Sequence, residues 1–395
     1  MTKTNVPRLR FRGGDGEWKE DKLGAQLKFI NGRAYKQNEL LEHGKYKVLR
    51  VGNFYTNNEW FYSDLELDDK KYVSKGDLIY TWSATFGPHI WEGDKVIYHY
   101  HIWKIELSDL MDKNFVLYFL EYDKNNLLRN TNGSTMIHVT KSSMENKEIS
   151  FPEEFEQQKI GSFFAKIDKI IELQNQKLGQ LKKLKRGYLQ KMFPQDGESL
   201  PRLRFSGFSG EWKELRVKDI GTIVTGNTPS KKDKSNYGGE NVWITPSDIY
   251  SDSTYLNDST TKLSDKGKEI SRIIPKDSVI VTCIASIGKN ALSDCELSIN
   301  QQINAVIPNE KFDPYFLLNL SNQWSMEMNR LTSNASLKII NRTEFSELET
   351  LVPEFEEQQK IGSFLRKLDQ MINDQSDKIN ELKQQKKAYL QKMFI

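Results

Sequence analysis

The chain has 395 residues, of which 37% are hydrophobic and 28% are charged, with a formal net charge of +3. This composition is typical of a folded protein of two or three domains and excludes an intrinsically disordered chain. There is no apolar run of the roughly 20 residues that cross a bilayer, no apolar stretch of a signal peptide at the N-terminus, and too few cysteines for a disulfide framework, so we expect a cytoplasmic protein without a membrane segment.

Positive charge is concentrated in two segments of the chain. Residues 157–193 have a net charge of +7 and residues 358–394 have a net charge of +4, which leaves −8 for the rest. Bulk charge therefore does not predict binding to nucleic acid, and any such prediction depends on local patches.

An internal repeat covers nearly the whole chain. At an offset of 194 residues the sequence repeats PRLRF and GEWKE, at Pro7–Phe11, Gly16–Glu20, Pro201–Phe205 and Gly210–Glu214. At an offset of 201 it repeats QQKIGSF and YLQKMF, at Gln157–Phe163, Tyr188–Phe193, Gln358–Phe364 and Tyr389–Phe394. Pro152–Phe193 and Pro353–Phe394 are identical at 24 of 42 positions. The chain is thus two copies of one unit, each a globular part followed by a long helix.

The two globular parts have diverged more than the helices but keep the same pattern. Lys75–Gly87 and Lys276–Gly288 each predict a buried strand that runs into a glycine turn. Met111–Leu120 and Phe312–Ser321 each predict an amphipathic helix. We therefore expect mixed α/β domains of the α+β kind, built on one framework.

Each long helix carries a coiled-coil seam. Apolar residues recur at alternating spacings of four and three, at eight of ten seam positions in each copy. The two polar seam positions are Gln174 and Lys185 in the first copy and Gln375 and Lys386 in the second. A polar seam residue can fix the register, and the two glutamines are the candidates for that role. The predicted apolar seam consists of Ile160, Phe164, Ile167, Ile171, Leu178, Leu181, Tyr188, Met192, Ile361, Leu365, Leu368, Ile372, Ile379, Leu382, Tyr389 and Met393.

Two pairings of the helices are open. They could dimerise two chains, or they could pair with each other in one chain, and we favour the second because one chain carries both seams. Antiparallel pairing gives an intramolecular coiled coil and a pseudo-twofold repeat. Two such domains suit an asymmetric, bipartite DNA target, whose gap is set by the helices. The expected parts are a globular domain at 1–152 with a linker at 1–15, a helix at 153–193, a linker at 194–209, a globular domain at 210–352 and a helix at 353–395.

This order of parts resembles the specificity subunit of Type I restriction-modification systems. The helices open with EFEQQKIGSFFAKID and EFEEQQKIGSFLRKLD and close with LKKLKRGYLQKMF and LKQQKKAYLQKMF. In the second globular part, TGNTPSKKDKSNYGG, VWITPSDI, CIASIGKN and SINQQINAVIP resemble the target recognition domains of that family.

The resemblance implies a non-catalytic, cofactor-free chain that binds double-stranded DNA. It further implies two modification (methyltransferase) subunits on the helical regions, with restriction subunits added to that core. S-adenosylmethionine, ATP and magnesium would be used by those partners.

Candidate DNA contacts follow from side-chain chemistry, since Asn and Gln can pair with adenine, and Arg and Lys with guanine or phosphate. In the second half they are Lys231, Lys232, Lys234, Asn236, Tyr237, Thr245, Ser247, Asp248, Ser286, Lys289, Asn300, Gln301, Gln302, Ser336 and Lys338. In the first half they are Arg33, Tyr35, Lys36, Trp82, Ser83, Thr85, His99, Tyr100, His101, Ser134, Thr135 and His138. A solvated loop or a turn cap is the alternative for most of them, and at most one of Gln301 and Gln302 faces DNA if their strand continues.

The first globular part departs from the family pattern. It has VIYHYHIWKIE where the second has SINQQINAVIP, which places His99, Tyr100 and His101 opposite Asn300, Gln301 and Gln302. The two histidines could form a metal pair, but the sequence offers no third ligand, and DNA-facing or satisfied histidines are the more common case.

Two rival functions remain open. A self-contained methyltransferase is disfavoured because FRGGDG and FSGFSG follow basic linkers rather than apolar strands, and no Walker motif or paired-carboxylate nuclease motif occurs. A coiled-coil adaptor that binds only proteins is disfavoured because it has no need of two matched but diverged domains.

Overall fold

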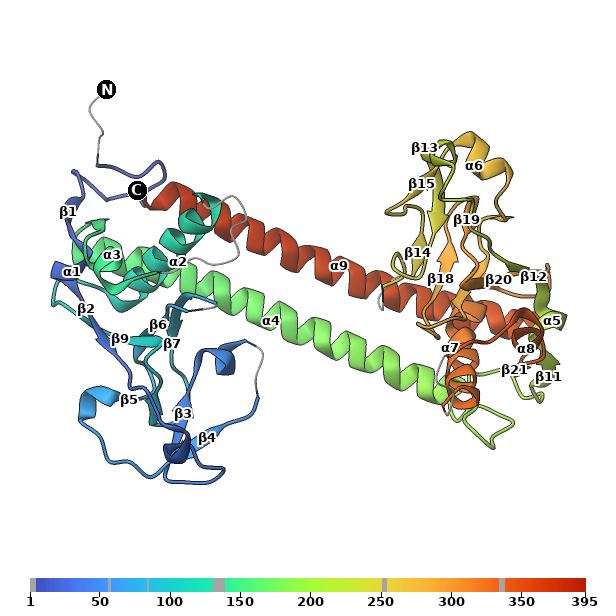
Figure 1. The fold of residues 1–395 in the computed structure, drawn as a ribbon, viewed down its shortest axis with the longest axis horizontal. Coiled ribbons are helices and arrows are strands. Elements are labelled where there is room, and N and C mark those ends of the chain that lie inside the picture. The colour runs from blue at the N-terminus through green and yellow to red at the C-terminus, as the bar shows by residue number, and fades with distance from the viewer. Residues whose placement is uncertain (1–4, 56–57, 84, 131–138, 251–253, 334–337) are drawn as a thin grey trace. The chain divides into compact units, whose positions relative to one another are not determined.

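The computed structural model describes residues 5–55, 58–83, 85–130, 139–250, 254–333 and 338–395. The chain divides into two compact units (Figure 1): unit 1 holds residues 1–176 and 377–395, and unit 2 holds residues 177–376. None of the helices formed by the described residues combines the length and the apolar content that a membrane crossing needs.

Unit 1 is built on two larger sheets. One is antiparallel, in the order β2-β9-β6-β7, and the other has the order β4-β3-β8-β5 with β3 parallel to β8. Its elements are β1 (Lys19–Lys22), α1 (Leu23–Gln26), β2 (Leu27–Asn31), β3 (Tyr46–Leu49), β4 (Phe61–Ser63), β5 (Tyr72–Val73), β6 (Leu78–Thr81), β7 (Gly87–Ile90), β8 (Val96–Tyr98), β9 (Ile102–Leu107), α2 (Lys113–Asn130), α3 (Lys141–Glu145), β10 (Glu148–Phe151) and the first part of α4 (Glu154–Met192).

Unit 2 repeats this plan, with sheet orders β12-β20-β17-β18-β14 and β15-β13-β19-β16. Its elements are β11 (Lys213–Arg216), α5 (Val217–Ile220), β12 (Gly221–Thr225), β13 (Tyr237–Ile244), β14 (Tyr255–Leu256), β15 (Lys262–Leu263), α6 (Asp265–Glu269), β16 (Ile273–Ile274), β17 (Val279–Thr282), β18 (Asn290–Ser293), β19 (Leu297–Ile299), β20 (Ile303–Pro308), α7 (Pro314–Leu331), α8 (Arg342–Ser346), β21 (Glu349–Val352) and the first part of α9 (Phe355–Met393).

The elements recur at the two offsets found in the sequence. Strands β2 and β12 are 194 residues apart, whereas β9 and β20 are 201 apart. The predicted strands are β6 and β17, and the predicted amphipathic helices are α2 and α7, each of 18 residues. Helices α4 and α9 have 39 residues each. The mixed α/β fold with a two-copy framework is therefore confirmed.

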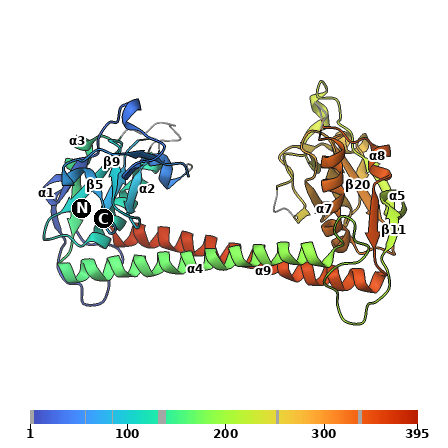
Figure 2. The same ribbon diagram turned by 90° about the horizontal axis from the view of Figure 1, so that it is seen from below.

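Within each unit the segments of the two long helices pair in an antiparallel sense (Figure 2). In unit 1 the ring of Phe163, near the start of α4, packs edge-on against Tyr389, near the end of α9, with centroids 5.2 Å apart. In unit 2 the order is reversed, because Tyr188 of α4 packs against Phe364 of α9 at 4.8 Å. The predicted seam residues are buried or half-buried, as is Gln375.

Two seam lysines are held by matching ion pairs. Lys185 of α4 lies 2.6 Å from Asp369 in unit 2, and Lys386 of α9 lies 2.8 Å from Asp168 in unit 1. Each aspartate also accepts a hydrogen bond of 2.8 Å from a tyrosine of the shorter helix, Tyr118 in one unit and Tyr315 in the other. Because a lysine and an aspartate meet at both ends only in this register, the pairs favour one alignment of the helices.

Glycines in the N-terminal parts of α4 and α9, eight residues into each helix, allow the shorter helices to approach closely. A Cβ on Gly362 would collide with the carboxylate of Asp313, which caps α7 by accepting the amide of Phe316 at 2.7 Å. A Cβ on Gly161 would lie 2.7 Å from Asn114 and 2.9 Å from the amide of Phe115. The same close contact is thus built into both units.

We expect Gly362→Ala to lower the free energy of unfolding by about 1–3 kcal/mol, because the methyl group must displace the cap of α7. Gly179→Ala is the matched control, since a Cβ there meets nothing within 4 Å and alanine favours a helix by about 1 kcal/mol over glycine. Denaturant unfolding of both variants checks this, and equal stability of the two would contradict the packing.

Candidate nucleic-acid interface

In unit 2, the segment that contains Asn300, Gln301 and Gln302 is a turn between two strands rather than one continuous strand. Strand β19 ends at Ile299, β20 begins at Ile303, and Gln301 and Gln302 form the turn between them. Of the two alternatives left open by the sequence, the strand does not continue through the glutamines, which lie in a turn. The alternation that would place them on opposite faces does not apply at this point. In unit 1, Tyr100 and His101 form the equivalent turn between β8 and β9.

The same backbone hydrogen bonds anchor the β8–β9 turn and the β19–β20 turn. In unit 2 they are Gly226 N to Ile303 O at 3.1 Å, Asn227 N to Ile299 O at 3.0 Å and Cys283 N to Gln302 O at 2.8 Å. In unit 1 they are Gly32 N to Ile102 O at 3.1 Å, Arg33 N to Tyr98 O at 3.0 Å and Trp82 N to His101 O at 3.1 Å. A Cβ on Gly32 or Gly226 would collide with backbone oxygens at the end of the opposing strand. Only glycine therefore allows the two backbone segments to approach this closely.

The side chains around the β19–β20 turn form an open, polar pocket of about 520 Å³. It brings together seven of the predicted contacts: Lys231, Thr245, Ser247, Ser286, Asn300, Gln301 and Gln302. Thr228, Trp243, Pro246 and Thr261 also line it and were missed as individual candidates. Thr228 lies within the family-like segment TGNTPSKKDKSNYGG, which was the available signal.

Three other candidates of unit 2 point into the protein. Asn236 is buried and donates to Ser230 O at 3.1 Å, and Tyr237 donates to Pro229 O at 2.6 Å. Asp248 is buried and accepts from the backbone amides of Thr245 and Thr260, each at 2.9 Å. Burial raises the pKa of its carboxyl, but these hydrogen bonds outweigh burial and the pKa is lowered overall. These side chains shape the loops that carry the exposed Lys231 and Lys232.

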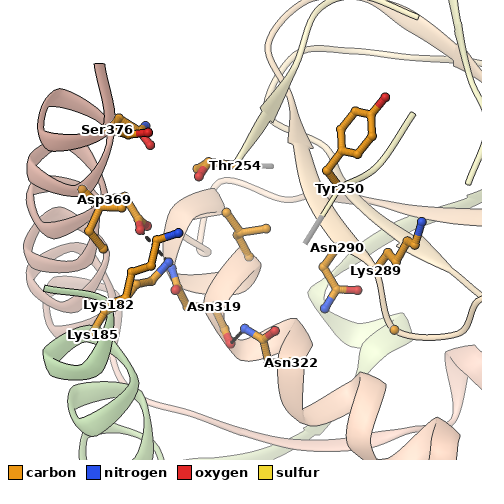
Figure 3. A pocket seen from close by; sticks show the side chains of 14 residues that line it. Lys182, Lys185, Tyr250, Thr254, Lys289, Asn290, Asn319, Asn322, Asp369 and Ser376 are labelled. Atoms are coloured by element: carbon orange, nitrogen blue, oxygen red, sulfur yellow. Dashed lines mark hydrogen bonds and ion pairs between the residues drawn. The ribbon is translucent and has the colours of Figure 1, made fainter. Parts of the chain in front are cut away.

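Lys289 lies outside the turn pocket. Its ammonium group donates to Pro246 O at 2.8 Å, and the residue lines a second pocket of about 500 Å³ beside Asn290, Asn319 and Asn322 (Figure 3). The Lys185–Asp369 ion pair closes one side of this pocket. Asn290 is itself bonded to Ser325 at 2.9 Å, so part of this polar lining is already satisfied within unit 2.

In unit 1 the predicted contacts form a chain of rings. The guanidinium of Arg33 lies over Tyr35, 5.3 Å from its centroid, and Tyr35 stacks at 6.4 Å on His99. His99 contacts His101 at 4.8 Å, and His101 meets the edge of Trp82 at 5.0 Å. Tyr100 contacts both histidines, at 4.4 and 3.9 Å. The β8–β9 turn therefore presents rings where the β19–β20 turn presents amides.

The pKa of His99 is lowered to about 4, mainly by burial and to a smaller extent by the neighbouring His101 and Arg50. Burial also lowers the pKa of His101. At neutral pH both rings are therefore uncharged, and each offers one donor and one acceptor nitrogen. Among the described residues no group of three His, Cys, Asp or Glu side chains could hold a metal ion.

Arg33, a member of the chain of rings, is also paired with Glu39 at 2.7 Å. Of the remaining candidates of unit 1, Lys36 and Thr85 are exposed and Ser83 is half-buried. Lys234 is exposed, and Lys338 lies 3.3 Å from the side-chain oxygen of Asn329. Ser134, Thr135, His138 and Ser336 lie outside the described residues.

Comparison with known proteins places both halves in one family. The model of the Type I restriction modification DNA specificity domain matches residues 15–183 and 209–384. The chain is 31% identical over 177 residues to the specificity subunit of the Type I restriction enzyme MjaIX from Methanocaldococcus jannaschii, a match that covers 44% of the chain and 41% of that relative.

Two further similarities extend over nearly the full length. The MjaVIII specificity subunit of the same organism is 23% identical, over 95% of the chain and 91% of the relative. The crystal structure of a Type I restriction-modification S subunit from M. genitalium superposes with a TM-score of 0.61 at 16% identity, over 99% of both chains. With two family domains and this shared fold, the chain belongs to the family of Type I restriction-modification specificity subunits.

Proposed function

We propose that this specificity subunit reads an asymmetric, bipartite DNA target, with one half-site for each globular domain. The observation that carries the proposal is the pair of equivalent turns, β8–β9 and β19–β20. Matching backbone hydrogen bonds hold them, yet they present different side chains. A fixed backbone with exchanged side chains lets two domains dock in the same way and select different bases.

The chemistry of the two turns supports two different half-sites. The amides and hydroxyls around Gln301 and Gln302 are suited to hydrogen bonds with base edges in the major groove. The neutral rings of His99, Tyr100 and His101 offer stacking surfaces and single hydrogen-bonding groups instead. The exposed Lys231 and Lys232 next to the β19–β20 turn pocket are placed to contact phosphates, which positions the domain without reading sequence.

The paired helices serve as the spacer and as the docking surface for two methyltransferase subunits in this proposal. Each 39-residue helix is about 58 Å long at 1.5 Å per residue. The chain itself performs no catalysis. Methylation with S-adenosylmethionine, and cleavage with ATP and magnesium, belong to the modification and restriction subunits.

The experiment that tests this function is genome-wide mapping of adenine methylation in cells that carry the methyltransferase partner with and without this chain. We expect a motif of two unlike blocks, separated by a fixed gap, only when the chain is present. An unchanged methylation pattern, together with no sequence-selective binding by the purified complex, would contradict the proposal.

We also expect that replacing Lys231, Lys232 and Lys234 together by Ala weakens DNA binding equally for all sequences. The salt dependence of binding should fall by about one unit of log–log slope for each phosphate that a lysine no longer neutralises. Lys19, Lys22 and Lys28, which are exposed on β1 and β2 and lie outside the long helices and the candidate contacts, provide the matched triple variant. Titrations at several salt concentrations check this, and a change in the preferred sequence would show that the loop reads bases.

A further inference from the structure

The amide of Asn300 has a defined orientation. Its side chain is 5% exposed, and its Oδ1 accepts a hydrogen bond from the backbone amide of Gln302 at 3.0 Å. A backbone N–H can only donate, so the atom that faces it must be the oxygen. The Nδ2 group of Asn300 is therefore on the other side and acts as a donor.

This orientation fixes the amide of Gln302 in turn. Nδ2 of Asn300 lies 3.2 Å from Oε1 of Gln302 and donates to it. Because Oε1 of Gln302 faces Asn300, its Nε2 group is the part of the amide that can donate a hydrogen bond into the pocket. Among the residues that the structure describes, none accepts a hydrogen bond from that Nε2. The neighbouring Gln301 has the same polarity, since Oε1 accepts a hydrogen bond from the hydroxyl of Thr228.

We propose, on the basis of the function proposed above, that the β19–β20 turn is a donor pair that recognises hydrogen-bond acceptors on base edges. In the major groove, guanine presents N7 and O6 and thymine presents O4. Bidentate recognition of adenine requires a glutamine oxygen that faces N6, whereas the oxygens of Gln302 and Gln301 are turned toward Asn300 and Thr228. Asn300 is thus a positioning residue that sets the polarity of Gln302. This replaces the adenine preference suggested by residue type alone.

Asn300→Asp is the most direct test because it keeps the size of the side chain. One carboxylate oxygen can still accept the backbone amide of Gln302, but the other can no longer donate. Gln302 must then rotate its amide so that Nε2 faces the carboxylate and Oε1 faces the DNA. We expect the preference at one base pair of the second half-site to move from guanine or thymine to cytosine or adenine, by about tenfold.

The measurement uses the complex of the chain with its methyltransferase subunits and a DNA library randomised at both half-sites. Bound DNA is sequenced, and the first half-site serves as an internal control that should not change. Ser286→Asp, which adds the same charge to the same pocket, should lower affinity without changing preference. Gln302→Glu, which presents only acceptors, should shift preference in the same direction as Asn300→Asp and covers the case in which that variant does not fold.

A guanine or thymine at one position in the native motif, shifted by these variants but not by Ser286→Asp, supports the inference. A native second half-site with only adenine or cytosine on the recognised strand would overturn it, as would acceptor variants that change affinity alone. If the native complex selects no bipartite motif at all, the proposed function itself fails.

Discussion

The C-terminal end of α9 packs into the hydrophobic core of unit 1, and the C-terminal end of α4 packs into the core of unit 2. Phe394, after α9, packs at 5.3 Å on Phe115 and at 6.0 Å on Phe164 in unit 1. Phe193, after α4, packs at 5.4 Å on Phe316 in unit 2. These rings are buried, so separation of the helices would expose the centre of both cores. Helix pairing and domain folding are therefore one process.

This constraint explains why the two long helices have diverged less than the two globular parts. The helix ends must fill matching cavities, and the arginines that precede the globular parts secure the helix starts. Arg10 pairs with Glu156 and Arg204 with Glu357, both at 2.7 Å. The β8–β9 and β19–β20 turns are held by matching backbone hydrogen bonds, and the side chains of Tyr100 and Gln301 at their tips are exposed. Their side chains can differ between the halves without cost to the fold, which is the property that an asymmetric reader needs.

Much of the framework could be predicted from the sequence because it depends on periodic patterns. The seam spacing, the two offsets and the buried runs at Val279–Thr282 and Leu78–Thr81 were sufficient for the long helices and central strands. The inference of pairing within one chain needed only that both seams occur together.

The details of the interface could not be predicted because they depend on contacts between distant segments. The turn at Gln301 contains no glycine or proline and is created by hydrogen bonds to Gly226 and Cys283. The inward direction of Asn236 and Asp248 also depends on partners that residue type does not reveal. The positions of the candidates were thus partly predictable, whereas their orientation was not.

In the proposed function, two globular domains with the same backbone framework each recognise their own half-site. The most direct test is a variant in which a second copy of residues 210–351 takes the place of residues 16–151. Its binding motif, determined with the methyltransferase subunits, should contain two copies of the second half-site with an unchanged gap. A motif that still contains the first half-site would contradict the account, because the sequence preference would then lie outside the exchanged domain.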